Sequence, residues 1–201
     1  VHVASPNGPV INRFRTVTNN IHIIDTPSQI QAVYGVSFPI LRSLISIIFS
    51  NTNKQLKKII NEIKPDLVHL NEVGLITTAK CVKQLGIKVV MHVRVAVNPS
   101  FRIIYNLSTN YINKYVDHII CIDKSASSSL NVKVKKTIVY NPLITINKKT
   151  NTIGDNETFT ILFLSNFLVH KGIYDLINVA EELDDFNNIK FLIAGSNVKS
   201  N

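Results

Sequence analysis

The sequence predicts an α/β protein built from parallel strand–helix–strand units. Short runs rich in Val, Ile and Leu alternate with longer segments whose apolar residues recur at helical spacing. Several short runs are apolar nearly throughout, which is typical of parallel strands covered by helices on both faces. Clusters of Pro, Gly, Asn and Ser separate the segments. The alternation therefore predicts doubly wound, Rossmann-like sheets.

Residues 1–147 contain most of the predicted elements. A dense turn signal, Ser5-Pro6-Asn7-Gly8-Pro9, follows the first strand, Pro27 closes the second, and Gly86 ends a helix. Strands are predicted at residues 1–4, 21–25, 66–70, 87–93, 118–122 and 137–140. Helices are predicted at residues 39–63, with a candidate break at 51–53, and at 74–85, 101–115 and 125–130. These elements form one predicted Rossmann-like domain.

A second, shorter unit follows a polar stretch. Residues 148–157 are polar almost throughout, and we interpret them as a linker. A strand at 160–164, a helix at 173–183 and a strand at 189–194 come next. Residues 158–201 are therefore predicted to open a second Rossmann-like domain.

Composition and charge narrow the function classes. The chain has 201 residues, of which 45% are hydrophobic and 17% charged, with a mean hydropathy of +0.17, so a disordered chain is excluded. No apolar run reaches the ~18 residues of a membrane span. Cys81 and Cys121 lack CxxC spacing, so neither a zinc site nor a redox motif is indicated, and buried free thiols are expected. The fingerprints of dinucleotide and P-loop sites are absent.

The net charge of +9 is unevenly distributed. Residues 1–150 hold 19 basic and 6 acidic residues, giving +13, and residues 151–201 hold 3 and 7, giving −4. The positive charge of residues 1–150 would attract nucleic acid, anionic lipid or phosphorylated ligands. Basic side chains scattered over a solvated surface are an equally good interpretation. The lysines of the helix over 39–63, with Arg42, favour either an anionic membrane surface or, more simply, solvent around an apolar core stripe.

Ligands of open α/β sheets bind outside the carboxyl ends of the strands. The loop from Ser165 and Asn166 to Lys171 and Gly172 joins a strand to a helix, whose N-terminus suits phosphate. An ordinary loop with a solvated lysine is the alternative interpretation. The other residues after strands include Ser5–Gly8, Asn71, Glu72, His92 and Arg94. On position alone His92 is a structural or a catalytic histidine, Arg94 binds an anion or reaches solvent, and His69, inside a strand, is expected to be buried.

The order of these segments resembles the family-4 glycosyltransferases of the GT-B fold, in which two Rossmann-like domains face each other. Residues 1–9 resemble the second strand and loop of the N-terminal domain. The other matching segments are Lys64–Asn71 with "kPDvVHlh", Val116–Ile122 with "aDhiicvS", Ile138–Pro142 with "viyNgvd", Thr160–Gly172 with "ilfvGRl…KG" and Phe191–Gly195 with "l.ivG.G". Asp123 stands where that family has Ser, and Asn166 stands where it has Arg.

The resemblance implies a retaining sugar transfer from a nucleotide-sugar to a glycan or lipid-linked acceptor, without metal or other cofactor. It implies that Lys171, Asn166, Ser165 and Gly172 bind the donor diphosphate, and that His92 faces the reacting sugar. Asn7, Gly8, Asn71, Glu72 and Arg94 would line the acceptor side. It also implies polysaccharide, capsule or lipopolysaccharide synthesis in the cytoplasm, with peripheral contact to an anionic inner-membrane surface.

The resemblance also places the family's first strand before Val1 and its acidic E-x7-E segment after Asn201. We therefore expect the chain to be an incomplete fragment that is inactive alone. The alternative is a non-catalytic α/β sugar- or phosphate-binding module, or a glycosyltransferase-like partner subunit. The interpretation as a nucleic-acid-binding protein depends on charge alone. We do not expect it, because only 7% of the residues are aromatic and Trp is absent.

Overall fold

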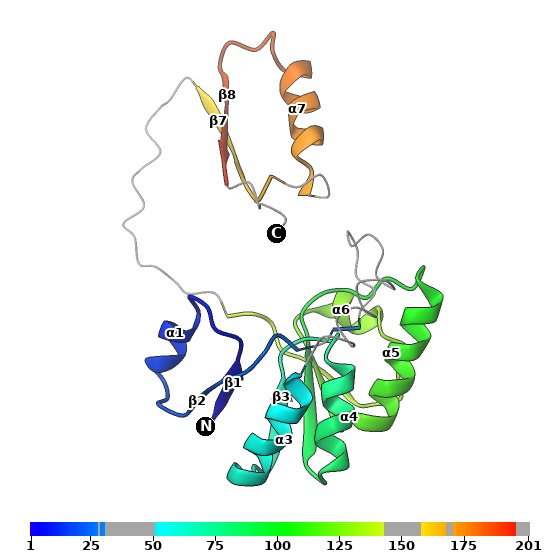
Figure 1. Ribbon diagram of the computed structural model, residues 1–201. Coiled ribbons are helices and arrows are strands. Elements are labelled where there is room, and N and C mark those ends of the chain that lie inside the picture. Colours follow the sequence, from blue (N-terminus) through cyan, green and yellow to red (C-terminus); the bar gives the residue numbers. More distant parts are fainter. Residues whose placement is uncertain (28, 31–50, 143–157, 168–170, 196–201) are drawn as a thin grey trace. The chain divides into compact units, whose positions relative to one another are not determined.

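A computed structural model describes residues 1–27, 29–30, 51–142, 158–167 and 171–195 (Figure 1). The chain divides into two compact units, residues 1–142 and 143–201. Each unit is described by itself. The predicted linker at 148–157 lies outside the described residues.

The described residues of the first unit form two parallel sheets. Strand β1 (Val3–Ser5) pairs with β2 (Ile21–Ile23) in a two-stranded sheet. The larger sheet has the order β3-β4-β5-β6, with strands Leu67–Leu70, Lys88–Val93, His118–Cys121 and Lys136–Ile138. All of these pairs are parallel, which confirms the predicted class. The strands are mostly shorter than predicted.

The helices of this unit follow the predicted order with one addition. They are α1 (Ile11–Arg15), α3 (Thr52–Ile63), α4 (Ile76–Gln84), α5 (Arg102–Tyr115) and α6 (Lys124–Ser128). Helix α1 was not predicted, because five residues are too few to display a helical period. Helix α3 begins after Asn51, and the predicted helical residues 39–50 lie outside the described residues.

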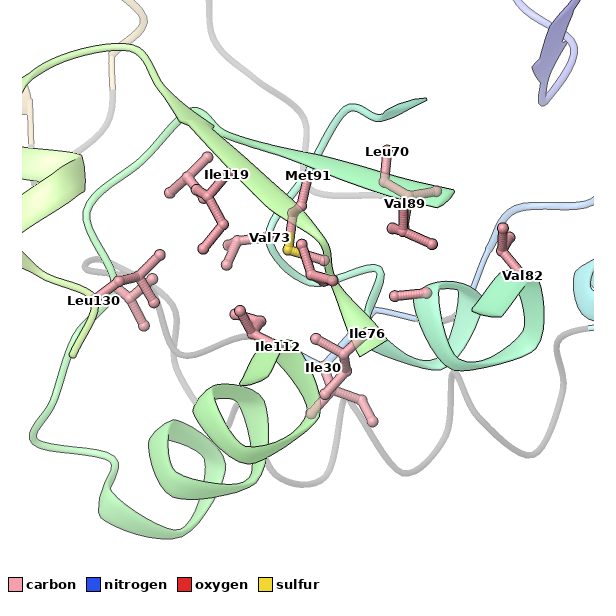
Figure 2. Close-up of a cluster of buried hydrophobic side chains, with 14 of the residues drawn as sticks. Ile30, Leu70, Val73, Ile76, Val82, Val89, Met91, Ile112, Ile119 and Leu130 are labelled. Carbon is pink, nitrogen blue, oxygen red and sulfur yellow. The ribbon is translucent and has the colours of Figure 1, made fainter. Parts of the chain in front are cut away.

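The core lies between the larger sheet and helices α4 and α5. Alternate β4 residues Val89, Met91 and Val93 are fully buried, since side chains along a strand point to opposite faces in turn. In Figure 2, Met91 of β4 and Ile112 of α5 point into the same apolar cluster. Burying such side chains supplies most of the stability, at about 1.5–3 kcal/mol each.

Helix α3 confirms the simpler interpretation of its lysines. Leu56 and Ile60 are buried in the core, whereas Lys54, Lys57 and Lys58 are exposed. The described apolar stripe therefore packs on the protein, and contact with a membrane surface stays a prediction. In the described part of the chain, no helix is both long and apolar enough to span a bilayer.

Asp117 joins β4 to the beginning of β5. Its backbone N–H donates to the carbonyl of Val89, and its Oδ2 accepts from the Val89 N–H at 2.8 Å. Its Oδ1 accepts from Nζ of Lys83 on α4. Burial alone would raise the pKa of Asp117, but the hydrogen bonds from Lys83 and Val89 and the nearby lysine charges outweigh it and lower the pKa. This network gives a structural reason for the aspartate of the segment Val116–Ile122.

The second unit is a βαβ element made of β7 (Phe159–Leu164), α7 (Ile173–Glu182) and β8 (Ile189–Ala194). The two strands are parallel and pair over six residues. No residue of α7 is buried, and Leu162 and Leu164 of β7 are 62% and 74% exposed. All of the buried core residues among those described belong to the first unit.

Candidate functional site

The carboxyl ends of β3 and β4 bring five predicted or neighbouring site residues together. They are His69, Asn71, Glu72, His92 and Arg94, and we call them the β3–β4 cluster. The strands are parallel and adjacent, with Leu70 opposite Met91, so residues that follow both strands emerge at one sheet edge. This is the edge at which open α/β sheets bind ligands.

His92 lies on the face of the sheet opposite Met91 and is partly exposed. Its Nε2 atom is buried and has no hydrogen-bond partner among the described residues. Burial lowers the pKa of His92, and the charges of His69 and Arg94 lower it further. The imidazole is therefore neutral at pH 7 and able to accept a hydrogen bond at an unprotonated nitrogen.

The prediction that His69 is buried was wrong. Its strand, β3, lies at the edge of the described four-stranded sheet, and His69 is exposed. Its ring stacks on the ring of His92, with centroids 5.6 Å apart and planes 26° from parallel. His69 lies inside an apolar run of the sequence, so its stacking on His92 was not predicted.

Glu72 and Arg94 add opposite charges to the cluster. Burial raises the pKa of Glu72, although the Val73 N–H, which donates to its Oε1 at 2.8 Å, and the Arg94 charge act against the rise. Arg94 is exposed, and its guanidinium donates to Oδ1 of Asn71 at 3.5 Å, a weak hydrogen bond. These groups offer hydrogen-bond donors and acceptors to a hydroxyl-bearing ligand.

Asn7 and Gly8 belong to a different edge. They follow β1 in the two-stranded sheet, and no described hydrogen bond joins them to the β3–β4 cluster. Asn7 is exposed, and the Gly8 carbonyl accepts from the N–H of Ile11 at the beginning of α1. Their acceptor role therefore stays a prediction.

The predicted phosphate loop follows β7 in the second unit. The N–H of Ser165 donates to the carbonyl of Ala194 at 3.1 Å, which extends the β7–β8 ladder to the beginning of the loop. Gly195 passes so close to Ser165 that a Cβ there would collide with the Ser165 carbonyl group. In the sequence, Gly195 is only the last residue of the matching segment Phe191–Gly195, and its contact with Ser165 was not predicted because it joins distant residues.

The loop ends at the N-terminus of α7. Gly172 precedes the helix with φ of 81°, a left-handed conformation that favours glycine, and Lys171 beside it is exposed. Asp175 lies in the first turn of α7, with its Oδ2 3.5 Å from the position of a Gly172 Cβ. Its negative charge stabilises the helix dipole and also opposes an anion at the same terminus. Residues 168–170 lie outside the described residues.

No metal centre accompanies these sites in the described residues, and the second unit carries an open hollow. No three His, Cys, Asp or Glu side chains lie close enough together there to hold a metal ion. An open hollow of about 370 Å³ lies between α7 and β8, lined mainly by apolar side chains such as Leu176 and Phe191. Its lining residues do not include Ser165, Asn166, Lys171 or Gly172 of the predicted phosphate loop.

Two parallel α/β units in succession, with polar residues at the carboxyl ends of the strands, agree with a GT-B glycosyltransferase-like fold. Solved structures confirm this class. The chain is similar to Anabaena Alr3699/HepE in complex with UDP and glucose, with a TM-score of 0.61 and 14% identity over 93% of this chain. It is also similar to Anabaena Alr3699/HepE in complex with UDP-glucose, with a TM-score of 0.59 and 12% identity over 94% of this chain.

The chain spans 59% of the length of these Anabaena structures. No protein-family model and no curated protein sequence matches it. At 12–14% identity the likeness shows the fold, and membership of family 4 stays a prediction.

Proposed function

We propose that this chain belongs to a glycosyltransferase that moves a sugar from a nucleotide-sugar donor to a hydroxyl of an acceptor. One observation carries the proposal: the Ser165–Gly172 loop leads from a parallel strand directly to the N-terminus of α7, in a fold shared with a protein crystallised with UDP-glucose. Free N–H groups at such a terminus, with Lys171 beside them, favour the diphosphate of a donor.

The donor side is assigned to Ser165, Asn166, Lys171 and Gly172. As the bond between sugar and diphosphate breaks, negative charge grows on the departing phosphate, and the Lys171 ammonium stabilises it. Asn166, in place of the arginine that the resemblance leads one to expect, supplies hydrogen bonds but no charge. We therefore expect weaker donor binding than an arginine would give.

The acceptor side is assigned to Asn71, Glu72 and Arg94 of the β3–β4 cluster and to Asn7 and Gly8 after β1, and His92 is assigned to face the reacting sugar. His92 offers a neutral ring to a sugar hydroxyl, and Asn71, Glu72 and Arg94 offer further hydrogen bonds. The resemblance additionally favours retention of the anomeric configuration, no metal requirement, and a glycan or lipid-linked acceptor met at an anionic inner-membrane surface. These finer features depend on the family-4 resemblance.

A titration of the isotope-labelled chain with UDP-glucose tests the donor side. We expect amide shifts at Ser165, Asn166 and the first turn of α7. Lys171→Ala should weaken binding at least fivefold, whereas Asp175→Asn should strengthen it about two- to fivefold by removing the opposing charge. Lys190→Ala is the matched control, because this exposed lysine lies in the amino-terminal half of β8. Equal binding by all three variants would refute the assignment.

A non-catalytic sugar- or phosphate-binding module is the second candidate. The described fold and loop serve both functions, so turnover separates them. In the longest form of the protein that folds, an enzyme releases UDP from UDP-glucose when a hydroxyl acceptor is present. Binding without UDP release across a panel of nucleotide-sugars and glycan acceptors would favour the binding module.

A further inference from the structure

The two histidines of the β3–β4 cluster form a stacked pair that the sequence pattern does not reveal. His69 and His92 come from adjacent parallel strands and lie on the same face of the sheet, opposite the buried face of Leu70 and Met91. Their ring centroids are 5.6 Å apart and the ring planes differ by 26°. His69 is exposed, so the core does not require its ring.

We propose that His69 is a positioning residue, whose stacked ring fixes the plane of the His92 imidazole so that Nε2 of His92 accepts a hydrogen bond from a sugar hydroxyl. The role of the hydroxyl rests on the proposed function. The stacking itself does not, and it can be measured in the absence of any ligand.

The first argument is the Nε2 atom of His92, which is buried and has no hydrogen-bond partner among the described residues. A buried polar atom without a partner is destabilising, so native structures rarely keep one unless a ligand or water completes it. A hydroxyl supplies both a donor for Nε2 and an acceptor for a neighbouring N–H, such as that of the Arg94 guanidinium.

The surroundings of His92 give the second argument. Beyond the ends of β3 and β4 stand Glu72 and the exposed Arg94, while on the β5 side the residue opposite His92 is the apolar Ile120. His118, also on β5, is hydrogen-bonded through Nε2 to Thr137. Among the described residues, His69 is therefore the ring that stacks on His92. Of the titratable groups around His92, it is the one whose contact constrains the plane of the His92 ring.

The burial of His92 and the charge of His69 both lower the pKa of His92. The His69 ring covers one side of the His92 ring, and burial is the main cause of the lowered pKa of His92, followed by the charges of His69 and Arg94. A neutral His92 accepts a hydrogen bond, whereas the doubly protonated ring donates from both nitrogens and cannot accept. Stacking therefore maintains both the orientation and the protonation state that a hydroxyl ligand needs.

Histidine NMR on the labelled chain tests the proposal. The His92 signals are assigned from the spectrum of His92→Gln, and their pH titration and tautomer are compared in wild type, His69→Ala and His69→Phe. We expect His69→Ala to raise the His92 pKa toward the ordinary value of about 6.5 and to broaden its ring signals. His69→Phe retains an aromatic cover without the charge, so it should preserve the ring signals and raise the pKa less.

His2→Ala is the matched control, because His2 stacks on His22 in the two-stranded sheet and should leave His92 unchanged. An unchanged His92 titration in His69→Ala would overturn the positioning role, whatever the donor experiment shows. Methyl α-glucoside is the ligand probe: we expect it to shift the Nε2 resonance of His92 in wild type and His69→Phe and much less in His69→Ala. Equal shifts in all three proteins would also overturn the proposal, whereas absent UDP-glucose binding would refute only the proposed donor function.

Discussion

Asp117 provides the sharpest test of how the first unit is held together. Its carboxylate accepts hydrogen bonds from the Val89 N–H and from Lys83, and its own N–H donates to the Val89 carbonyl. Asp117→Ala leaves the Val89 N–H unpaired in the sheet. Asp117→Asn retains an oxygen acceptor for that N–H but removes the negative charge.

The magnitude follows from these two changes. Leaving a part-buried N–H unsatisfied costs about 1–3 kcal/mol, so we expect Asp117→Ala to lower the free energy of unfolding by about 2 kcal/mol. The Lys83 and Asp117 side chains are 36% and 37% exposed, so solvent screens their ion pair and its loss adds at most about 1 kcal/mol. We therefore expect Asp117→Asn to lower the free energy of unfolding by about 1 kcal/mol.

Urea unfolding, followed by circular dichroism, measures these differences, and hydrogen exchange of the Val89 amide reports the local bond. The pKa of Asp117 is lowered in the folded state, so its contribution is complete above the unfolded-state pKa and is lost as the pH falls below about 4. The gap between wild type and Asp117→Asn should therefore stay constant from pH 5 to 8 and close in acid. Equal stability of the alanine and asparagine variants, or a gap that widens in acid, would refute the reasoning.

Three further substitutions probe the loop, a helix cap and the core. Gly195→Ala should displace the β7–α7 loop, because its Cβ meets a backbone carbonyl, and should abolish the UDP-glucose binding proposed above. Gly8→Ala has open space and should leave the fold unchanged. A Gly195→Ala variant with normal loop signals and normal binding would contradict this contact. Asp123 caps α6, because its Oδ1 accepts from the Ala126 N–H at 2.7 Å. Asp123→Ala should therefore lower the free energy of unfolding, measured in urea, by about 1 kcal/mol, whereas Asp123→Ser should lower it little. Equal losses of stability in the two variants would contradict the capping role. Ile112→Ala should lower the free energy of unfolding by about 2–5 kcal/mol, because the Ile112 side chain is fully buried. Ile103 is 73% exposed, so Ile103→Ala should change that free energy by less than about 0.5 kcal/mol.

The regular elements were predictable because their signals are local. The apolar run 87–93 predicts β4, and the helical spacing over 101–115 predicts α5, within one residue of the observed bounds. Proline and glycine punctuation places the ends of the remaining elements within a few residues. Helix α1 escaped prediction because five residues hold little more than one turn.

The chemistry of the candidate site was less predictable because it depends on contacts between distant residues. The positions of His92 and Lys171 follow from the rule that ligands bind at the carboxyl ends of strands. The stacking of His69 on His92 depends on β3 having β4 as its one neighbour in the described sheet, which no local pattern reveals. The same holds for the approach of Gly195 to Ser165, and Asp175 opposes an anion only because the turn of α7 brings its carboxylate back toward Gly172.

The exposed strands and helix of the second unit affect how the chain unfolds. With no described residue of β7, α7 or β8 buried, this unit has little apolar packing to protect its backbone amides. The first unit keeps its sheet around fully buried residues such as Met91 and Ile119. The chain should therefore lose its structure in two steps, with the amides of β7 and β8 exchanging long before those of β4. A protease added under native conditions should digest the second unit first and leave the first as a stable fragment.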